Sequence, residues 1–223
     1  MSNASILQNN NQTLLDNNLS IDALIKSINN LSEGGSEDLQ ELATAFIQRT
    51  FTEYNNDTIT SIGNSAFRAC ANLTKVSFSK ATNTGEYAFY DCPKLTDVNF
   101  PVATTVSSQC FRGCTSLTEA TFPEATFVGA YAFYQDPKLT TVRLPKVKNI
   151  GISVFNGCTN LTTLIIEQAD TPCTLASNAL ASSGIANGAG YIYVPDSRVD
   201  AYKSATNWSA YAAQIKPLSE LEG

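Results

Sequence analysis

Apolar residues recur through the middle of the chain at a fixed step of 22 residues. A phenylalanine marks each step, and a leucine follows it six residues later. The two columns are Phe67, Phe89, Phe111, Phe133 and Phe155, and Leu73, Leu95, Leu117, Leu139 and Leu161. A constant period of this size predicts a solenoid, in which one small unit stacks on copies of itself.

Each unit has two halves with different patterns. Aligned on the phenylalanine, the units run 62–83, 84–105, 106–127, 128–149 and 150–171. The second half alternates apolar and polar residues, which predicts a strand with Val76 and Phe78 turned inward. The first half predicts a turn at Gly63 and then a short helical or 3₁₀ stretch. The fold class is therefore an α/β repeat solenoid with one short parallel strand per 22-residue repeat.

The segments beside the repeats are expected to close the solenoid. Residues 51–61, with a strand near their start, are predicted to form an N-terminal cap, and the solenoid itself covers 62–195. Residues 196–223 are predicted to form a helical C-terminal cap, because Asp196 or Ser197 can begin a helix there. A second helical turn carrying Tyr211 and Ile215 is expected after Asn207, and Trp208 is expected to pack within the cap.

Residues 1–50 do not follow the repeat and form a polar arm with helical periodicity. Their apolar residues occupy heptad positions over residues 14–31, namely Leu14, Ile21, Leu24, Ile28 and Leu31. One interpretation is a pair of helices that fold back as a cap. The other is a stalk that joins copies of the chain into a homo-oligomer, such as a trimer, since heptads of this kind form coiled coils.

Composition excludes several classes of function. The formal net charge is -6 and the isoelectric point is about 4.6, which argue against binding to nucleic acid or an anionic membrane. No apolar run is long enough for a transmembrane helix, and the first residues do not resemble a signal peptide. The chain has no histidine, which removes imidazole catalysis and most zinc sites. We expect no cofactor, no metal and no enzymatic activity.

Four cysteines share one column of the repeat, and an aspartate takes the remaining place. The column reads Cys70, Cys92, Cys114, Asp136 and Cys158. Thiols one repeat apart form a ladder, so we interpret them as small buried apolar groups and not as disulfides or metal ligands. Cys110 is also expected in the core. Cys173, in an insertion after the last repeat, is expected near solvent.

The repeat resembles the BspA-like leucine-rich repeats of bacterial surface proteins. The shared template is I-G-x-x-A-F-x-x-C-x-x-L-T-x-V-x-F-P-x-A-T, and the resemblance covers about residues 55 to 195. It implies a curved leucine-rich-repeat solenoid used for adhesion or protein recognition, with binding on the concave face formed by the strands. It brings no catalytic residues. Residues 191–208 also resemble the end segment of such proteins, and the polar arm resembles those of bacteriophage structural proteins.

Two outward columns of the predicted strands form one candidate surface. The first holds Lys75, Asp97, Glu119, Thr141 and Thr163, and the second holds Ser77, Asn99, Thr121, Arg143 and Ile165. The surface is polar, with small side chains and mixed charge. It is either a solvated sheet face with cross-strand pairs such as Lys75–Asp97, or a shallow site for a protein or a glycan.

A second candidate surface follows the core phenylalanines along one flank. One column reads Arg68, Tyr90, Arg112, Tyr134 and Asn156, and another reads Ser65, Tyr87, Gln109, Tyr131 and Ser153. Alternate units resemble each other, which indicates a 44-residue double repeat. The flank is either a ladder of stacked cations and rings that only stabilises the solenoid, or a contact strip with the composition of an interface hot spot.

The sequence favours a non-enzymatic recognition or adhesion module. The expected partner is a protein or a surface glycan, and the expected location is extracellular, on a bacterial surface or a phage particle. The alternative function is structural, in which the arm oligomerises and the solenoid is a spacer.

Overall fold

The computed structural model describes residues 53–55, 57, 59–168 and 170–221. The chain divides into two compact units, Met1–Phe46 and Ile47–Gly223, and all described residues lie in the second. The polar arm with its heptads at 14–31 lies outside the described residues. Its helical structure and its role in oligomerisation therefore remain predictions.

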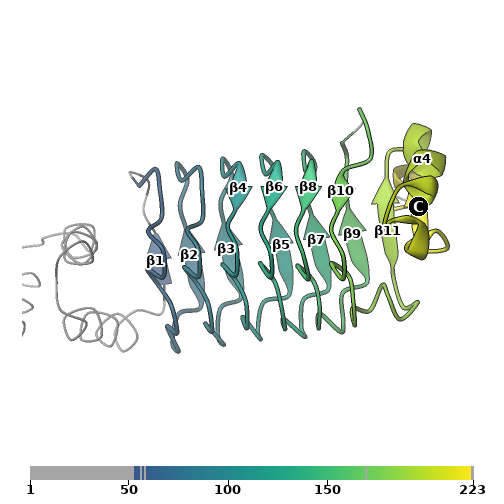
Figure 1. Cartoon of the computed structure of the whole chain (residues 1–223). Coiled ribbons are helices and arrows are strands. Elements are labelled where there is room, and N and C mark those ends of the chain that lie inside the picture. The colour runs from purple at the N-terminus through teal and green to yellow at the C-terminus, as the bar shows by residue number, and fades with distance from the viewer. Residues whose placement is uncertain (1–52, 56, 58, 169, 222–223) are drawn as a thin grey trace, which may run out of the picture. The chain divides into compact units, whose positions relative to one another are not determined.

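The described unit is a parallel β-solenoid of about six turns with little helix (Figure 1). A main sheet is built from short strands, of which the first three are β1 (Glu53–Asn55), β2 (Lys75–Ser77) and β3 (Asp97–Asn99). It resumes with β5 (Glu119–Thr121), β7 (Thr141–Arg143), β9 (Thr163–Ile165) and β11 (Tyr191–Val194). The predicted solenoid of stacked, parallel repeats is confirmed.

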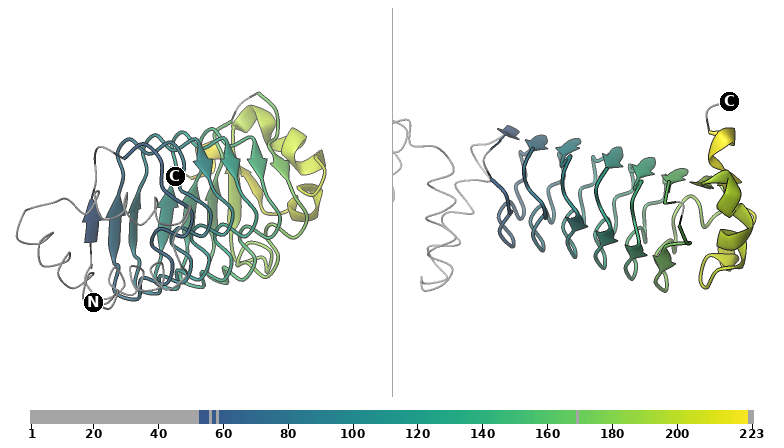
Figure 2. Two further views of the ribbon diagram at one scale, coloured as in Figure 1. Left: turned by 60° about the vertical axis from the view of Figure 1, so that its left-hand side comes forward. Right: turned by 90° about the horizontal axis from the view of Figure 1, so that it is seen from above.

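Each of the central turns also contributes a second strand, which the sequence did not predict. β4 (Thr105–Val106), β6 (Phe127–Val128), β8 (Asn149–Ile150) and β10 (Thr174–Leu175) form a separate parallel sheet. This second sheet runs along the side opposite the main sheet (Figure 2). A two-residue strand has a single inward side chain, such as Val128, so it leaves no alternating pattern to detect.

The predicted helical half of each unit is a series of turns instead. In every turn the residue two places before the phenylalanine has a left-handed backbone, as in Tyr87 with φ 56° and Tyr131 with φ 58°. A residue with positive φ cannot continue a right-handed helix. The backbone groups pair with the next turn instead, for example from Phe89 N–H to the Cys110 carbonyl at 2.8 Å.

Within the 22-residue units, the register of the paired strands places each residue beside its counterpart 22 positions away. Lys75 pairs with Asp97, and Glu119 pairs with Thr141. The buried Phe67 and Phe89 rings lie 5.1 Å apart with an interplanar angle of 8°, and the stack continues to Phe155. Offset aromatic pairs stabilise by about 0.5–1.5 kcal/mol each beyond their burial. The phenylalanine column is therefore a main source of stability in the core.

The cysteine column is buried and reduced, as predicted. All six cysteines are free and buried. The thiol of Cys92 donates to the Phe67 carbonyl at 3.0 Å, and that of Cys158 donates to the Phe133 carbonyl at 2.9 Å. Burial raises the pKa of the Cys158 thiol well above its ordinary value, so this thiol stays neutral.

The prediction that Cys173 lies near solvent is wrong. Its side chain is 4% exposed. The backbone N–H of Cys173 donates to the Tyr202 hydroxyl at 3.2 Å, and Trp208 Nε1 donates to the Cys173 carbonyl at 2.7 Å. The insertion is covered because these two aromatic residues, about 30 positions later, fold onto it.

The last described residues combine short helical turns with one strand. η1 (Asp196–Arg198) leads into α4 (Val199–Ser204), which η2 (Ser209–Tyr211), β12 (Ile215–Pro217) and η3 (Leu218–Glu220) follow. The predicted second helical turn is wrong at Ile215, which lies in β12 and pairs with Ile192 of β11. Trp208 is fully buried. The role of this segment as a cap remains a prediction.

Candidate functional site

The flank residues gather into one continuous surface, which we call the Arg/Tyr strip. It consists of Arg68, Tyr87, Tyr90, Gln109, Arg112, Tyr131 and Tyr134. Tyr87 and Gln109 both have a left-handed backbone, with φ of 56° and 55°. This conformation costs roughly 1 kcal/mol for a residue with a side chain. Hydrogen bonds between turns oppose the cost, such as that from Gln109 N–H to the Ala130 carbonyl at 2.9 Å.

Arginine and tyrosine alternate along the strip as a stack. The Arg68 guanidinium carbon lies 4.9 Å from the centre of the Tyr90 ring. The Arg112 guanidinium carbon lies 5.2 Å from Tyr90 and 4.9 Å from Tyr134. Each such contact contributes about 0.5–1 kcal/mol at an exposed site. The predicted stacking of arginine on tyrosine is confirmed, whereas the role of these residues in binding a partner remains a prediction.

Hydrogen bonds and ring contacts tie the second column to the first. Gln109 Nε2 donates to the Tyr87 hydroxyl at 2.7 Å, and Arg112 Nη1 donates to Gln109 Oε1 at 3.0 Å. The Tyr87 and Tyr90 rings lie 6.1 Å apart, and those of Tyr131 and Tyr134 lie 5.6 Å apart. Arg112 lies between two tyrosines, so the stack occupies the face of its guanidinium group. The groups that can contact a partner are the ring edges, the hydroxyls and the remaining guanidinium N–H groups.

The outward columns of the main sheet form the second candidate surface, but the prediction is wrong for Ile165, which is buried at 6% exposure beside Tyr193 of β11. Lys75 Nζ and Asp97 Oδ2 lie 2.8 Å apart, which confirms the predicted cross-strand pair. Asn99 Nδ2 donates to Ser77 Oγ at 2.9 Å, and Arg143 forms an ion pair with Glu167. Part of this surface therefore consists of polar groups that are already paired with neighbours in the fold. As partner-binding residues, Lys75, Asp97, Asn99, Glu119 and Arg143 remain predictions.

Two tyrosines at the end of the main sheet extend this surface, and the sequence did not single them out. Tyr191 aligns with Thr163, and Tyr193 aligns with Ile165. The two rings meet edge to face at 6.3 Å, and Lys216 Nζ lies 5.6 Å from the Tyr191 ring centre. The signal was the alternating segment Tyr191–Val194, which the repeat template does not include.

The main sheet is interrupted between β3 and β5, which belong to separate sheets. Thr96 N–H donates to the Thr74 carbonyl at 2.9 Å, and Thr140 N–H donates to the Thr118 carbonyl at 2.8 Å. Among the described residues, no equivalent bond joins Thr118 to Thr96. The second sheet continues across the same turns, because β4 pairs with β6. Between these two turns, the strand pairing is therefore lost in the main sheet and kept in the second sheet.

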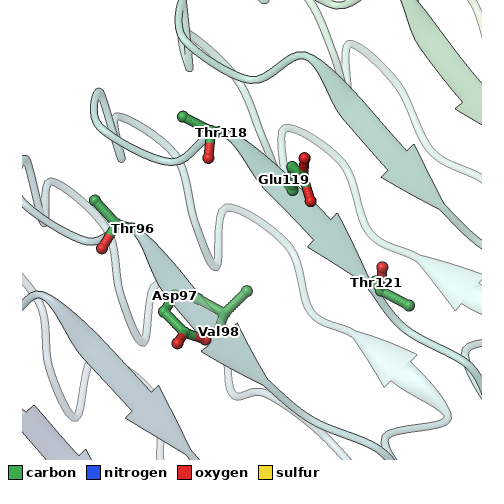
Figure 3. A pocket seen from close by; sticks show the side chains of 6 residues that line it. All are labelled: Thr96, Asp97, Val98, Thr118, Glu119 and Thr121. Carbon is green, nitrogen blue, oxygen red and sulfur yellow. The ribbon is translucent and has the colours of Figure 1, made fainter.

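A pocket of about 340 Å³ occupies this interruption, and we call it the β3–β5 cleft. It is lined by Thr96, Asp97, Val98, Thr118, Glu119 and Thr121 (Figure 3). Asp97 and Glu119 are successive members of one outward column, and like charges opposite each other destabilise a strand pair. Their repulsion gives a physical reason for the interruption.

No group of three or more acidic, thiol or imidazole side chains among the described residues could hold a metal ion. Within the same residues, no helix has the length and apolar character needed to cross a membrane.

Comparison with known proteins identifies the repeat. The family model of the BspA type leucine rich repeat region matches the chain in six copies, over residues 43–162 and 126–187. The chain belongs to this family. The BspA-type template has a cysteine at the position that forms the ladder of buried thiols. Asp136 is the one residue of this column that departs from the template.

Two solved structures are similar to this BspA-type chain. The pneumococcal vaccine antigen PcpA has a TM-score of 0.60 at 15% identity, covering 77% of this chain and 41% of that one. A leucine rich cell surface protein from Faecalibacterium prausnitzii A2-165 has a TM-score of 0.50 at 28% identity, covering 61% of this chain and 36% of that one. The chain spans about two fifths of the length of these relatives. No curated protein matches it.

Proposed function

We propose that the chain is a non-enzymatic recognition module that binds a protein partner through the Arg/Tyr strip. The observation that carries this proposal is the continuous stack of Arg68, Tyr90, Arg112 and Tyr134, held at 4.9–5.2 Å between cation and ring. Tyrosine and arginine are the residues most enriched in interface hot spots. A stack that is already ordered loses less side-chain entropy when a partner binds.

The geometry of the stack favours a protein over a glycan. A sugar ring packs best on a free aromatic face, whereas Tyr90 has a guanidinium on each side. Hydroxyls, ring edges and guanidinium N–H groups are left to face outward, and these suit the mixed polar and apolar surface of a protein. A glycan partner therefore becomes an outcome of the test below.

A bacterial cell surface is the proposed location. The support is the BspA-type repeat and the likeness at 28% identity to a protein described as a leucine rich cell surface protein. PcpA, described as a vaccine antigen, adds only the shared fold. The location on a phage particle rests on the sequence of the arm alone.

The test is a screen of purified host and bacterial surface proteins and glycans against the full chain, followed by affinity measurements on variants. Arg112→Ala removes two cation–ring contacts and a hydrogen bond, and we expect it to weaken binding at least tenfold. Lys148→Ala removes an exposed positive charge that belongs to neither candidate surface, so it is the control and should keep its affinity. Thermal unfolding of each variant separates a lost contact from a lost fold.

Two results would contradict the proposal. Unchanged affinity of Arg112→Ala and Tyr134→Ala, together with lower stability, would leave the strip a stabilising ladder only. A chain that forms a stable oligomer and binds nothing in the screen would favour the alternative function, in which the solenoid is a spacer.

A further inference from the structure

The β3–β5 cleft exposes backbone and side-chain acceptors that are paired elsewhere in the main sheet. In neighbouring turns, Phe78 N–H donates to the Asn99 carbonyl at 3.0 Å and Phe122 N–H donates to the Arg143 carbonyl at 3.1 Å. No equivalent bond runs from Phe100 to Thr121 within the described residues. In this part of the described chain, the carbonyls of Thr96 and Thr121 therefore lack a partner from the adjacent strand, as do the N–H groups of Thr118 and Phe100.

The floor of the cleft is apolar and its rim is acidic. Val98 is partly exposed, whereas its counterparts Val76 and Val142 in the same column are fully buried. Asp97 and Glu119 stand on the two sides of the opening (Figure 3). Glu119 forms no ion pair with any described residue, and the pair of Asp97 with Lys75 is half exposed, so it contributes little.

We propose that the β3–β5 cleft binds an arginine side chain of a partner protein. A guanidinium is planar, always charged and carries five N–H donors in a fixed fork. It can enter the slot between two parallel strands and donate to the two carboxylates and the free carbonyls, while its methylene stem packs on Val98. A lysine ammonium carries only three donors on one atom and has no planar fork, so it should make fewer hydrogen bonds in the cleft and bind more weakly.

Charge and donor chemistry exclude the other simple occupants. The two carboxylates repel an anion. The described residues hold no third acidic or thiol side chain at this place that would complete a metal site. The cleft lies on the main sheet and shares no residue with the Arg/Tyr strip, so the two proposals stand or fall separately.

The first test titrates the full chain with the tripeptide acetyl-Gly-Arg-Gly-amide and follows backbone amide resonances by NMR. We expect saturable shifts at Val98, Thr118 and Phe100. The same peptide with citrulline, which keeps the shape and loses the charge, should give none, and the lysine peptide should bind more weakly. Glu119→Gln should weaken binding about tenfold, because a charge-assisted hydrogen bond is lost.

A matched control separates this site from general electrostatic attraction. Glu124→Gln removes the same charge from the same turn, but Glu124 pairs with Lys146 at 2.7 Å outside the cleft. It should leave the tripeptide affinity unchanged. Equal weakening by Glu119→Gln and Glu124→Gln, or equal binding of the citrulline or lysine peptide, would overturn the proposal.

The second test asks whether the sheet is open in solution. Amide hydrogen exchange should be faster at Thr118 than at Thr140, which is bonded to the preceding turn. Glu119→Lys places an opposite charge beside Asp97, so we expect it to pair the strands, slow exchange at Thr118 and abolish binding of the arginine peptide. Equal protection of Thr118 and Thr140 in the unmodified chain would show a closed sheet and overturn the proposal.

Discussion

Asp136 should make the stability of the solenoid depend on pH in an unusual direction. Its carboxyl group is fully buried, and neither oxygen has a hydrogen-bond partner among the described residues. Burial raises the pKa of Asp136 well above its ordinary value, so the folded chain holds this group protonated. In the unfolded chain the carboxyl group has its usual pKa of about 3.9.

The sign of the effect follows from the proton count. Above about pH 3.9 the unfolded chain loses the proton while the folded chain keeps it, so the unfolded chain is favoured increasingly as pH rises. Below about pH 3.9 both states hold the proton, and Asp136 does not make the free energy of unfolding depend on pH. Above it, the free energy of unfolding falls by about 1.4 kcal/mol per pH unit while Asp136 remains protonated in the fold. The loss continues as pH rises for as long as the folded chain keeps the proton on Asp136.

Asp136→Cys removes this dependence and restores the repeat. A thiol at this position stays neutral in both states through this range, and it can donate to a backbone carbonyl as Cys158 does to Phe133. The difference in free energy of unfolding between Asp136→Cys and the unmodified chain should therefore grow with pH, by about 1.4 kcal/mol per unit. Urea unfolding at pH 5, 6 and 7 measures it, and the ordinary carboxylates cancel because both proteins share them.

Two further variants isolate the cause. Asp136→Asn keeps the shape and removes the titration, so it should show the same pH slope relative to the unmodified chain as Asp136→Cys. Gln135→Asn changes an exposed side chain that does not titrate, beside Asp136, and should show the same pH dependence as the unmodified chain. A difference between Asp136→Cys and the unmodified chain that does not change with pH would refute the reasoning.

Two predictions test the packing between turns by urea unfolding. Gly85→Ala should destabilise by roughly 2–4 kcal/mol, because φ is +69° and the new Cβ would lie 2.6 Å from the Gly63 carbonyl oxygen. Gly188→Ala, with φ +81° and open space, should cost only about 1 kcal/mol, and equal costs would contradict the reasoning. Phe111→Ala should cost about 3–5 kcal/mol, because it empties the middle of the buried phenylalanine stack. Phe127→Ala, at 43% exposure, should stay within about 0.5 kcal/mol, and a similar cost for both would mean that the stack is not the core.

Much of the Arg/Tyr strip was predictable because a solenoid turns sequence period into spatial neighbourhood. Residues 22 apart must lie one strand spacing apart, so Arg112 necessarily lies between Tyr90 and Tyr134. The hydrogen bonds of Gln109 to Tyr87 and Arg112 could not be predicted. They depend on the left-handed backbone at this column, which nothing in these side chains requires.

The period of the chain alone determined the stacked parallel architecture, the buried phenylalanine, leucine and cysteine columns, and the family. Each core position recurs in every unit, so its preference for one residue type is visible several times along the sequence. Only the tertiary structure decided what happens where the repeats differ. It opened the main sheet between Asp97 and Glu119, buried Cys173 under Tyr202 and Trp208, and enclosed Asp136 without a partner. Those outcomes depend on contacts between particular neighbours in space, and a period carries no information about them.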